Sequence, residues 1–292
     1  MAHVAACADA EDLLMKTHIA RTLGVKQLYH YQPAKLDWLQ QTISENTVHC
    51  PSPQDFNDPW DCQPCFDDSV VDDPAERARL IEYLDGAYRR QFPGKPEDEY
   101  RQRMQQVSSD ANLLRSMIRQ LSDIGNAIGE QYRVYCLSTL PDSILMWGLY
   151  AEKHRGLCLG FSTENEQFGS AYKVEYCDAY PKLNYADNDD EVIILPMITK
   201  SSLWSRECEF RVISEEASTA LSAGSLHTEN KLLSIPEHAL TSVIFGCLTP
   251  KKLKEEVRAL IDSSGHKIEL MEAQRIPNRY ALSIGPYETA PS

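Results

Sequence analysis

The sequence has few basic residues and no long hydrophobic run. It carries 29 lysines and arginines against 43 aspartates and glutamates, which gives a net charge of −14. A surface of that sign repels phosphate backbones, so non-specific nucleic-acid binding is disfavoured. The net charge does not exclude a local basic groove. No apolar stretch reaches the length of a membrane span, and the N-terminal stretch "MAHVAACADAEDLLMK" lacks a basic segment followed by a long apolar one. We therefore expect a cytoplasmic protein.

The nine cysteines do not follow the pattern of a disulfide framework. Their number is odd and they are scattered from Cys7 to Cys247, which suits reduced thiols in a core. A structural zinc needs four cysteine or histidine ligands, and four neighbouring candidates are His49, Cys50, Cys62 and Cys65. The second half of a paired Cys-x-x-Cys motif is missing, however. We expect incidental cysteines and no metal, with zinc or redox chemistry as the less favoured alternative.

The composition, with 42% hydrophobic and 25% charged residues over 292 positions, is that of a globular chain with a real core. We predict a helical arm over residues 1–25 and a single α+β domain over residues 26–292. Residues 72–131 read as amphipathic helices dense in charge, which predicts a helical insertion; whether it binds a partner protein is open. Short strands with interspersed helices and no βαβ rhythm predict a mostly antiparallel split sheet flanked by helices.

The expected elements are short. Strands are predicted at residues 26–32, 47–51, 132–139, 157–163, 172–177, 207–213, 240–248 and 266–276. Helices are predicted at residues 34–46, 142–156 and 250–265, and an acidic loop at residues 184–191.

The strongest local constellation is "KSSLWSRECEFR", which contains Trp204. On a strand there, alternation sends three side chains to the core and three charged ones to the opposite face. The core set is Cys208, Phe210 and Val212, and the charged set is Glu207, Glu209 and Arg211. Nearby like charges raise the pKa of one carboxylate, which suits a general base or a charge stabiliser. A salt-bridged, solvent-exposed strand is the plainer alternative.

Three further stretches carry candidate binding residues. In "MWGLYAEKHRG" a helix places Trp147 and Tyr150 on one face and His154 one turn beyond Tyr150. In "LYHY" the strand alternates His30 with Tyr31, and in "CLST" Ser138 and Thr139 end a strand, where a hydroxyl is a candidate donor to a ligand. Core packing is the alternative for each of these residues taken singly.

The turn "DFNDPWDC" combines carboxylates with aromatic rings. Asn57 and Asp58 suit turn capping before Pro59 and are candidates to hydrogen-bond a neighbouring loop or a ligand. A structural role is favoured for Asn57 and Pro59, whereas for Asp58 and Asp61 a structural corner and a ligand contact both stay open. Phe56 and Trp60 either anchor this turn or offer a stacking wall.

The order of these motifs resembles a widespread bacterial family, a domain of unknown function. The shared set is an LY-Y strand, FNDP, CxS, MWxxYAxxHxG and WxxExExR, over residues 26 to about 270, with the helical block in a stretch where that family varies. This resemblance names a family and no reaction.

A second, weaker resemblance is to the ADP-ribosyltransferase superfamily, whose members build a split α+β sandwich around an NAD cleft. It implies that His30 holds a ribose or phosphate, that Ser138 supports the nicotinamide side, and that Glu209, in Glu207-x-Glu209, stabilises the oxocarbenium as nicotinamide leaves. The serine motif is Leu-Ser-Thr here and not the usual Ser-Thr-Ser. The middle tyrosine is left open between Tyr31, Tyr135 and Tyr150.

This resemblance implies NAD as substrate, no metal, and a glycosyltransferase or NAD-cleaving reaction in toxin–antitoxin or anti-phage defence, with a protein or nucleic-acid acceptor. It also implies that Glu209→Gln abolishes NAD turnover and leaves folding intact. One alternative is a non-enzymatic sensor or interaction domain that binds a nucleotide-like molecule. Another is a metal-dependent hydrolase or nuclease that uses Asp58, Asp61, Glu207 and Glu209. The expected binding residues are Tyr31, Asn57, Asp58, Ser138, Trp147, Tyr150, His154, Trp204 and Arg211, and the expected catalytic residues are His30, Glu207 and Glu209.

Overall fold

The computed structural model describes residues 19–120, 124–183, 189–217 and 226–288, and it has the α+β class that the sequence predicts. The chain divides into two compact units. Of the described residues, those within Asn57–Glu130 and Glu175–Ser202 form the helical unit, and those within Thr17–Phe56, Gln131–Val174 and Leu203–Ser292 form the sheet unit. Most of the predicted helical arm lies outside the described residues. At its end, residues 19–24 form a β-bridge from Ile19 to Tyr172 and a turn.

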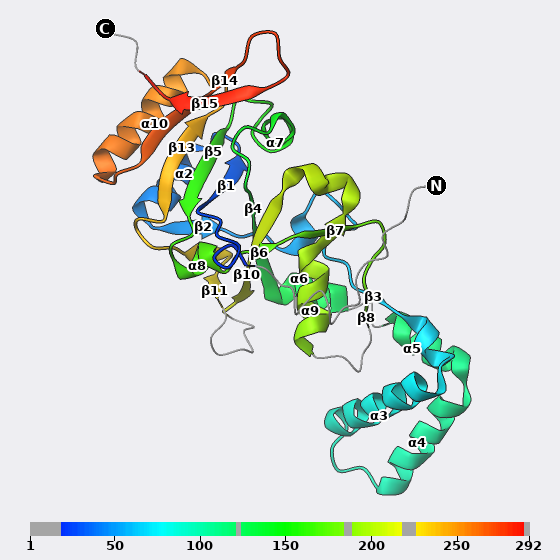
Figure 1. The fold of residues 1–292 in the computed structure, drawn as a ribbon. Helices are drawn as coiled ribbons and strands as arrows, with labels where there is room; N and C mark the ends of the chain where they lie inside the picture. Colours follow the sequence, from blue (N-terminus) through cyan, green and yellow to red (C-terminus); the bar gives the residue numbers. More distant parts are fainter. Residues whose placement is uncertain (1–18, 121–123, 184–188, 218–225, 289–292) are drawn as a thin grey trace. The chain divides into compact units, whose positions relative to one another are not determined.

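The sheet unit is built on one 11-stranded sheet (Figure 1). Its order is β15-β14-β13-β5-β1-β4-β10-β11-β12-β2, with β6 paired to β10. The strands are β1 Gln27–Gln32, β2 Thr47–His49, β4 Tyr132–Ser138, β5 Leu157–Ser162, β6 Tyr172–Lys173, β10 Glu209–Glu216, β11 His227–Glu229, β12 Leu232–Ser234, β13 Leu240–Phe245, β14 Glu269–Arg275 and β15 Leu282–Pro286. The pairs β10–β11 and β13–β14 are parallel and the other pairs are antiparallel, as the sequence predicts for most of the sheet.

One face of this sheet is an apolar core. Alternation sends Leu28 of β1, Leu137 of β4 and Phe210 of β10 to this side, where they are buried. Three helices with apolar stripes cover them: α2 Leu36–Ser44, α8 Glu166–Gly169 and α10 Lys251–Ser264. Burying each such side chain contributes about 1.5–3 kcal/mol, so this face carries much of the stability of the sheet unit.

The opposite face of the sheet collects most of the predicted site residues. Ser138 of β4 stands directly opposite Tyr29 of β1 on one side and Glu209 of β10 on the other. Residues directly opposite one another share a face, so these three side chains form one row. Helix α7, Ile144–Leu149, packs here through Met146 and Trp147.

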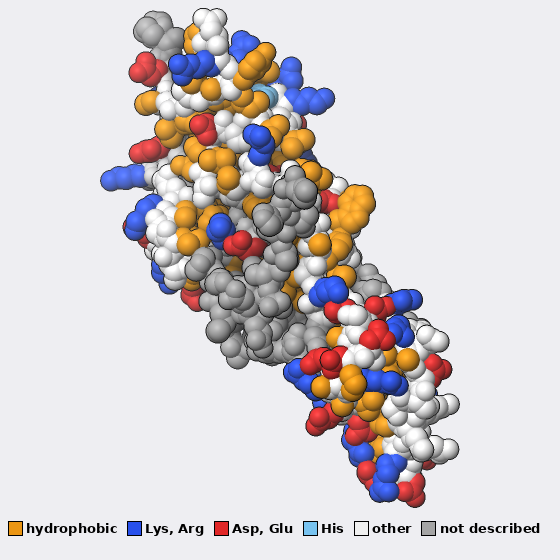
Figure 2. Space-filling model, turned by 45° about the vertical axis from the view of Figure 1, so that its right-hand side comes forward, with side chains coloured by type: hydrophobic (Ala, Val, Ile, Leu, Met, Phe, Trp, Pro, Cys, Tyr) orange, Lys and Arg blue, Asp and Glu red, His pale blue; other side chains and the backbone are white. Residues whose placement is uncertain are grey.

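The helical unit contains the predicted insertion. Its elements are α3 Pro74–Gln91, α4 Glu97–Ser109, α5 Ala111–Gln120, α6 Ile124–Gln131, α9 Asp189–Ile198 and two small sheets, β3 Cys65–Phe66 with β8 Lys182–Leu183 and β7 Glu175–Cys177 with β9 Thr199–Ser201. This unit also contains the 3-10 turn η2 Asp68–Val71. Two further 3-10 turns are η1 Pro53–Asp55 in the sheet unit and η4 Ser202–Glu207, which belongs to the sheet unit from Leu203 onward. Leu80, Val107 and Leu114 form the small core of α3–α5. Figure 2 shows acidic and basic side chains interspersed over α3 and α4, as the charge pattern predicts.

Helix α7 is shorter than its sequence predicts. It ends at Leu149, and Glu152, Lys153 and His154 then have positive φ of 47°, 55° and 70°. This left-handed turn is closed by the bond from the His154 N–H to the Trp147 carbonyl, 3.0 Å. The chain must reverse here because β5 begins at Leu157, directly after the turn. The prediction that His154 lies one helical turn beyond Tyr150 is therefore wrong.

Other boundaries differ as well. The single strand predicted at residues 172–177 is two short strands, β6 and β7, which pair with β10 and β9 respectively. Of the predicted acidic loop, residues 184–188 lie outside the described residues, and residues 189–191 begin α9. The strand predicted to end the fold is followed by β15, which closes a hairpin. None of the helices that the structure describes is long and apolar enough to cross a membrane.

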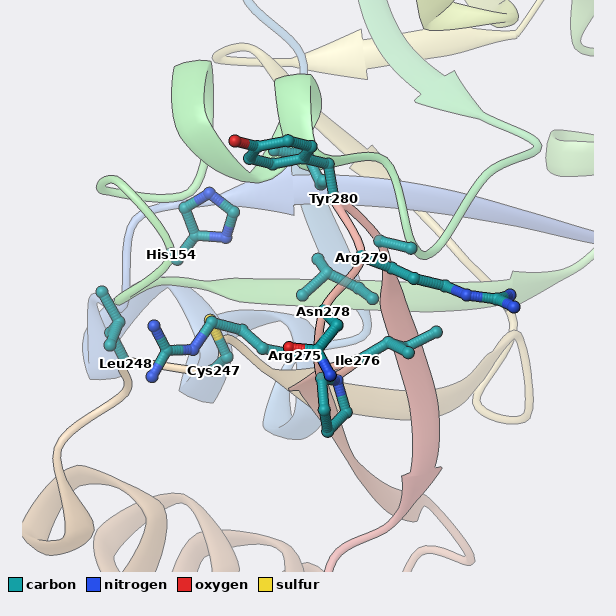
Figure 3. A pocket seen from close by; sticks show the side chains of 12 residues that line it. His154, Cys247, Leu248, Arg275, Ile276, Asn278, Arg279 and Tyr280 are labelled. Atoms are coloured by element: carbon teal, nitrogen blue, oxygen red, sulfur yellow. The ribbon is translucent and has the colours of Figure 1, made fainter.

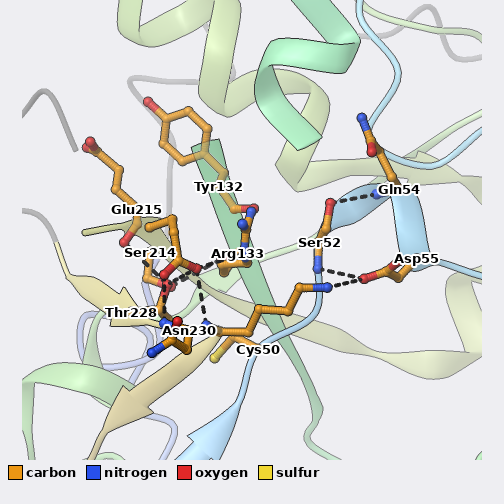
Figure 4. A network of polar contacts seen from close by, with 12 residues as sticks. Cys50, Ser52, Gln54, Asp55, Tyr132, Arg133, Ser214, Glu215, Thr228 and Asn230 are labelled. Atoms are coloured by element: carbon orange, nitrogen blue, oxygen red, sulfur yellow. Dashed lines mark hydrogen bonds and ion pairs between the residues drawn. The ribbon is translucent and has the colours of Figure 1, made fainter. Parts of the chain in front are cut away.

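A buried ion pair fixes the β11–β12 turn (Figure 4). Arg133 Nε lies 3.1 Å from a Glu216 carboxylate oxygen, and both side chains are largely buried. The same carboxylate accepts the backbone N–H groups of Asn230 (2.8 Å) and Lys231 (3.1 Å), which have positive φ. Glu216 therefore holds a tight turn. Sequence reasoning missed this role because nothing local in "VISEE" separates a buried glutamate from a solvated one.

Candidate functional site

Five polar side chains of the sheet unit, Ser138, Tyr150, Glu207, Glu209 and Arg211, lie at the start of β10; we call them the Glu–Arg cluster. Ser138 ends β4, Tyr150 caps α7, and Glu207 ends η4. Hydrogen bonds or strand pairing connect each member to another. The sequence predicted all five as site residues, and the structure brings them together.

Glu209 and Arg211 form a fully buried bidentate ion pair. Arg211 Nε donates to Glu209 Oε1 at 2.8 Å and Arg211 Nη2 donates to Oε2 at 3.1 Å. The two residues are 3% and 0% exposed. The guanidinium carbon lies 5.6 Å from the centre of the Phe56 ring, within reach of a cation–π contact. Phe56 thus provides an aromatic wall for the ion pair.

Glu207 is held by a neutral donor. The Tyr150 hydroxyl donates to Glu207 Oε1 at 2.7 Å, and Glu207 is 5% exposed. Ser138 Oγ donates to the Glu207 backbone carbonyl at 2.6 Å and accepts the Leu140 N–H at 3.1 Å. The hydroxyl of Ser138 therefore organises the backbone of the cluster, and among the described residues it does not bond to a carboxylate.

The strand at this point begins two residues later than predicted. Cys208 has a positive φ of 46°, so β10 starts at Glu209 and alternation does not extend back to Glu207. The expectation that Cys208 faces the core is therefore wrong, because that side chain is only half-buried, whereas Phe210 and Val212 are in the core as predicted. The exposed-strand alternative is also wrong, since both Glu207 and Glu209 are buried.

Tyr31 and Trp147 support the segment that follows β4. Their rings meet edge to face at 5.1 Å. The Tyr31 hydroxyl donates to the Leu140 carbonyl at 2.6 Å, and Trp147 Nε1 donates to the Pro141 carbonyl at 2.9 Å. Burial raises the pKa of Tyr31 well above its usual value. Both residues lie on the same face of the sheet as the Glu–Arg cluster. Their polar atoms are used in hydrogen bonds to backbone carbonyls.

His30 lies on the other face of the sheet from the Glu–Arg cluster. Strand alternation points it away from Tyr29 and Tyr31, and its ring stacks on Tyr135 at 4.2 Å. Its Nδ1 lies 2.8 Å from the Cys136 carbonyl, which a protonated Nδ1 satisfies as donor. The structure therefore does not bring His30 together with Glu207 and Glu209.

Burial lowers the pKa of His30 to about 4, from 6.5. Between these two values the unfolded chain binds a proton on His30 that the folded chain does not. The free energy of unfolding should therefore fall by about 3 kcal/mol as the pH drops from 6.5 to 4. Urea unfolding at pH 7, 5.5 and 4 measures this loss. The His30→Asn variant should lose less stability over the same range, and an identical pH profile would contradict the assignment.

Trp204, Asn57 and Asp58 were also predicted as binding residues. Trp204 is on η4 and half-buried. Asn57 and Asp58 belong to the helical unit, where Asp58 Oδ1 accepts the Trp60 N–H at 3.0 Å in a turn of the expected kind. Asp61 faces the Lys200 ammonium at 3.6 Å, and both side chains are buried in that unit. An ammonium in that place competes with a divalent cation for the carboxylate.

The four candidate zinc ligands divide between the units. His49 and Cys50 belong to the sheet unit, and Cys62 and Cys65 belong to the helical unit. Burial raises the pKa of the Cys50 thiol, which disfavours the thiolate that a metal requires. Within the described ranges no three potential ligands are grouped around a common point.

A separate pocket lies in the sheet unit beside the β14–β15 hairpin, and we call it the hairpin pocket (Figure 3). Its volume is about 870 Å³. Helix α7 contributes Ile144, the left-handed turn contributes His154, and the turn after β13 contributes Cys247 and Leu248. The hairpin contributes residues 275–282. His154 was predicted as a binding residue, and it lines this pocket.

Sequence reasoning missed the hairpin part of this pocket. The signal is "RIPNRYALSIGP", where a Pro-Asn turn separates two apolar alternating segments, a pattern typical of a hairpin. Asn278 adopts the positive φ of 60° that such a turn needs. Arg275 and Arg279 flank this turn, so two cations are placed at one end of the sheet.

No family model, curated protein or solved structure matches the chain. The resemblances to a bacterial domain family and to ADP-ribosyltransferases therefore stay predictions from motif order.

Proposed function

We propose that this protein cleaves the bond between nicotinamide and ribose in NAD and transfers the ADP-ribosyl group to an acceptor or to water. The observation that carries the proposal is the pair of buried carboxylates, Glu207 and Glu209, held by Tyr150 and Arg211 on one face of the sheet. Positive charge develops on the ribose as nicotinamide leaves. A carboxylate fixed in a dry site stabilises that charge without reorganising.

The two carboxylates have different partners, which suggests different roles. Arg211 binds Glu209 through two charge-assisted hydrogen bonds, so we assign Glu209 to positioning. Glu207 accepts the Tyr150 hydroxyl and stands outside this bidentate pair, so we assign Glu207 as the stabilising carboxylate. His30 has no role in this proposal, because it lies on the opposite face of the sheet.

The experiment is nicotinamide release from NAD by the purified full chain, with and without candidate protein and nucleic-acid acceptors. Glu207→Gln keeps an oxygen that accepts the Tyr150 hydrogen bond and removes only the charge. Turnover should fall about 10²–10³-fold, the usual effect of deleting one transition-state stabiliser. Glu164→Gln, a 74% exposed carboxylate in the same unit, is the matched control and should keep full activity. Release by wild type that survives Glu207→Gln would contradict the assignment.

A non-enzymatic binding domain is the second candidate function. It is favoured by the mutual pairing of Glu209 and Arg211, because such a pair keeps its shape without a substrate. No nicotinamide release by the wild-type chain under any of these conditions would favour this candidate. The metal-dependent hydrolase is less well supported, because the Lys200 ammonium faces Asp61, one of its four carboxylates.

A further inference from the structure

The hairpin pocket has a cationic lining on an acidic protein. Arg275, Arg279 and His154 line it, and of the described residues no aspartate or glutamate does. Of the two guanidinium groups, that of Arg275 extends toward His154 and that of Arg279 points away from it (Figure 3). The chain as a whole has a net charge of −14, so its surface does not favour anions in general. A pocket without acidic lining residues is therefore a local exception, and its charge is complementary to an anion.

Arg275 is the most informative of these cations. It is the last residue of β14, and Figure 3 shows its guanidinium extending toward the side of the pocket where His154 and Leu248 lie. Among the described residues, Arg275 has no carboxylate within ion-pair distance and its side chain makes no hydrogen bond. A guanidinium presents donors that match the geometry of a phosphate or a carboxylate, and here those donors are available.

His154 offers a second polar group at the same end of the pocket. Its Nδ1 is buried and has no hydrogen-bond partner among the described residues. Leaving a buried polar atom unsatisfied costs free energy, and a left-handed φ of 70° adds backbone strain. Burial lowers the pKa of His154, so a neutral imidazole with one donor and one acceptor faces the pocket at pH 7. A bound ligand would satisfy the orphan nitrogen.

The rest of the lining is apolar and partly exposed. Ile144 and Leu248 are 39% and 47% exposed, and Ile276 and Pro277 continue this surface along the hairpin. The Tyr280 ring is fully exposed at the rim. Exposed aliphatic and aromatic surface in a pocket of this size suits a flat ring, since small-molecule sites typically enclose about 300–1,000 Å³.

We propose that the hairpin pocket binds a small organic anion that joins a phosphate to a planar ring, the chemistry of a mononucleotide. Arg275 and His154 bind the phosphate, and Leu248, Ile276 and Tyr280 contact the ring. The site shares no residue with the Glu–Arg cluster, so this inference goes beyond the proposed reaction and does not depend on it.

The test is calorimetric titration of the full chain with AMP. Arg275→Gln should weaken AMP binding about tenfold or more, because it removes charge-assisted hydrogen bonds to the phosphate. Arg279→Gln is the matched control, since it makes the same charge change four residues away on a side chain that points away from His154 in Figure 3. It should change affinity by less than about threefold. Adenosine and inorganic phosphate, each lacking half of the ligand, should each bind at least about tenfold more weakly than AMP.

Alkylation of Cys247 localises the binding. This half-buried thiol lines the pocket, so AMP should slow its modification and leave the half-buried Cys65 of the helical unit unaffected, as read by peptide mass spectrometry. Glu207→Gln should leave AMP affinity unchanged, which separates this pocket from the proposed NAD site. Absence of AMP binding, equal weakening by Arg275→Gln and Arg279→Gln, or an unprotected Cys247 would overturn the proposal.

Discussion

Glu209→Gln is expected to lower the free energy of unfolding by about 3–5 kcal/mol, as is typical when one partner of a buried ion pair is removed. The reason is Arg211, which is 0% exposed and bonded twice to the Glu209 carboxylate. With glutamine in place of Glu209, the positive charge of Arg211 stays buried and loses its bidentate carboxylate partner. Urea unfolding of the two proteins measures the difference.

A double variant separates the buried charge from the loss of packing. Glu209→Gln with Arg211→Met removes both charges and keeps similar volume, so it should recover a large part of the stability that Glu209→Gln alone loses. Glu164→Gln, on the exposed surface of the same unit, should stay within about 0.5 kcal/mol of wild type. A loss below about 1 kcal/mol for Glu209→Gln would show that the pair contributes no more than an exposed one.

This result also bears on how the proposed reaction is tested. The sequence alone suggests that Glu209→Gln leaves folding intact, but the buried pairing with Arg211 makes that expectation unsafe. A loss of NAD turnover in that variant would combine lost charge with lost structure. Glu207→Gln avoids the problem, since the Tyr150 hydroxyl can donate to the amide oxygen as it donates to the carboxylate.

Trp147→Ala is the second change with a large expected effect, again about 3–5 kcal/mol of unfolding free energy. Trp147 is fully buried, and its ring meets Tyr31 edge to face at 5.1 Å. Its indole N–H also holds the Pro141 carbonyl at 2.9 Å. Alanine would leave a large cavity and an unsatisfied carbonyl under α7.

Two further substitutions show how much of that loss comes from the buried ring and how much from its hydrogen bond. Trp147→Phe keeps most of the ring and loses the hydrogen bond, so it should cost less than Trp147→Ala in the same urea experiment. Leu149→Ala is the matched surface control on α7, because Leu149 is 59% exposed, and it should cost only about 0.5 kcal/mol. Equal losses for Trp147→Ala and Leu149→Ala would mean that α7 does not depend on the buried indole.

Local patterns predicted the elements that depend on local physics. The apolar stripe of α10 and the alternation of Phe210 and Val212 in β10 are both in the sequence, and the structure contains both. The motif order also selected Tyr150, Glu207, Glu209 and Arg211 as candidates, and these four form two hydrogen-bonded pairs. The period of the apolar residues shows which face of a strand or helix each residue occupies. This signal lies within one short stretch of sequence, so reading it does not require knowing which distant segment packs there.

Features that depend on distant pairing could not be predicted in this way. The separation of His30 from Glu209 follows from the register of β1, β4 and β10, which no short window contains. The three left-handed residues before Gly156 are Glu152, Lys153 and His154. None of them is a glycine or an asparagine, so the sequence carries no residue signal for this turn. The hairpin pocket joins Ile144 to Leu282, and its orphan histidine is recognisable only once that packing is known.

The position of β1 in the sheet has a consequence for biosynthesis. This strand leaves the ribosome early, yet its neighbours are β4 and β5, more than a hundred residues later in the chain. At the far end of the sheet, β2 can pair only after β12 has been synthesised. Nascent β1 therefore has unpaired backbone and apolar side chains while the helical insertion is translated, and an exposed strand of this kind can pair with other chains. The α3–α5 hairpins have mostly local contacts, so they can fold during that interval.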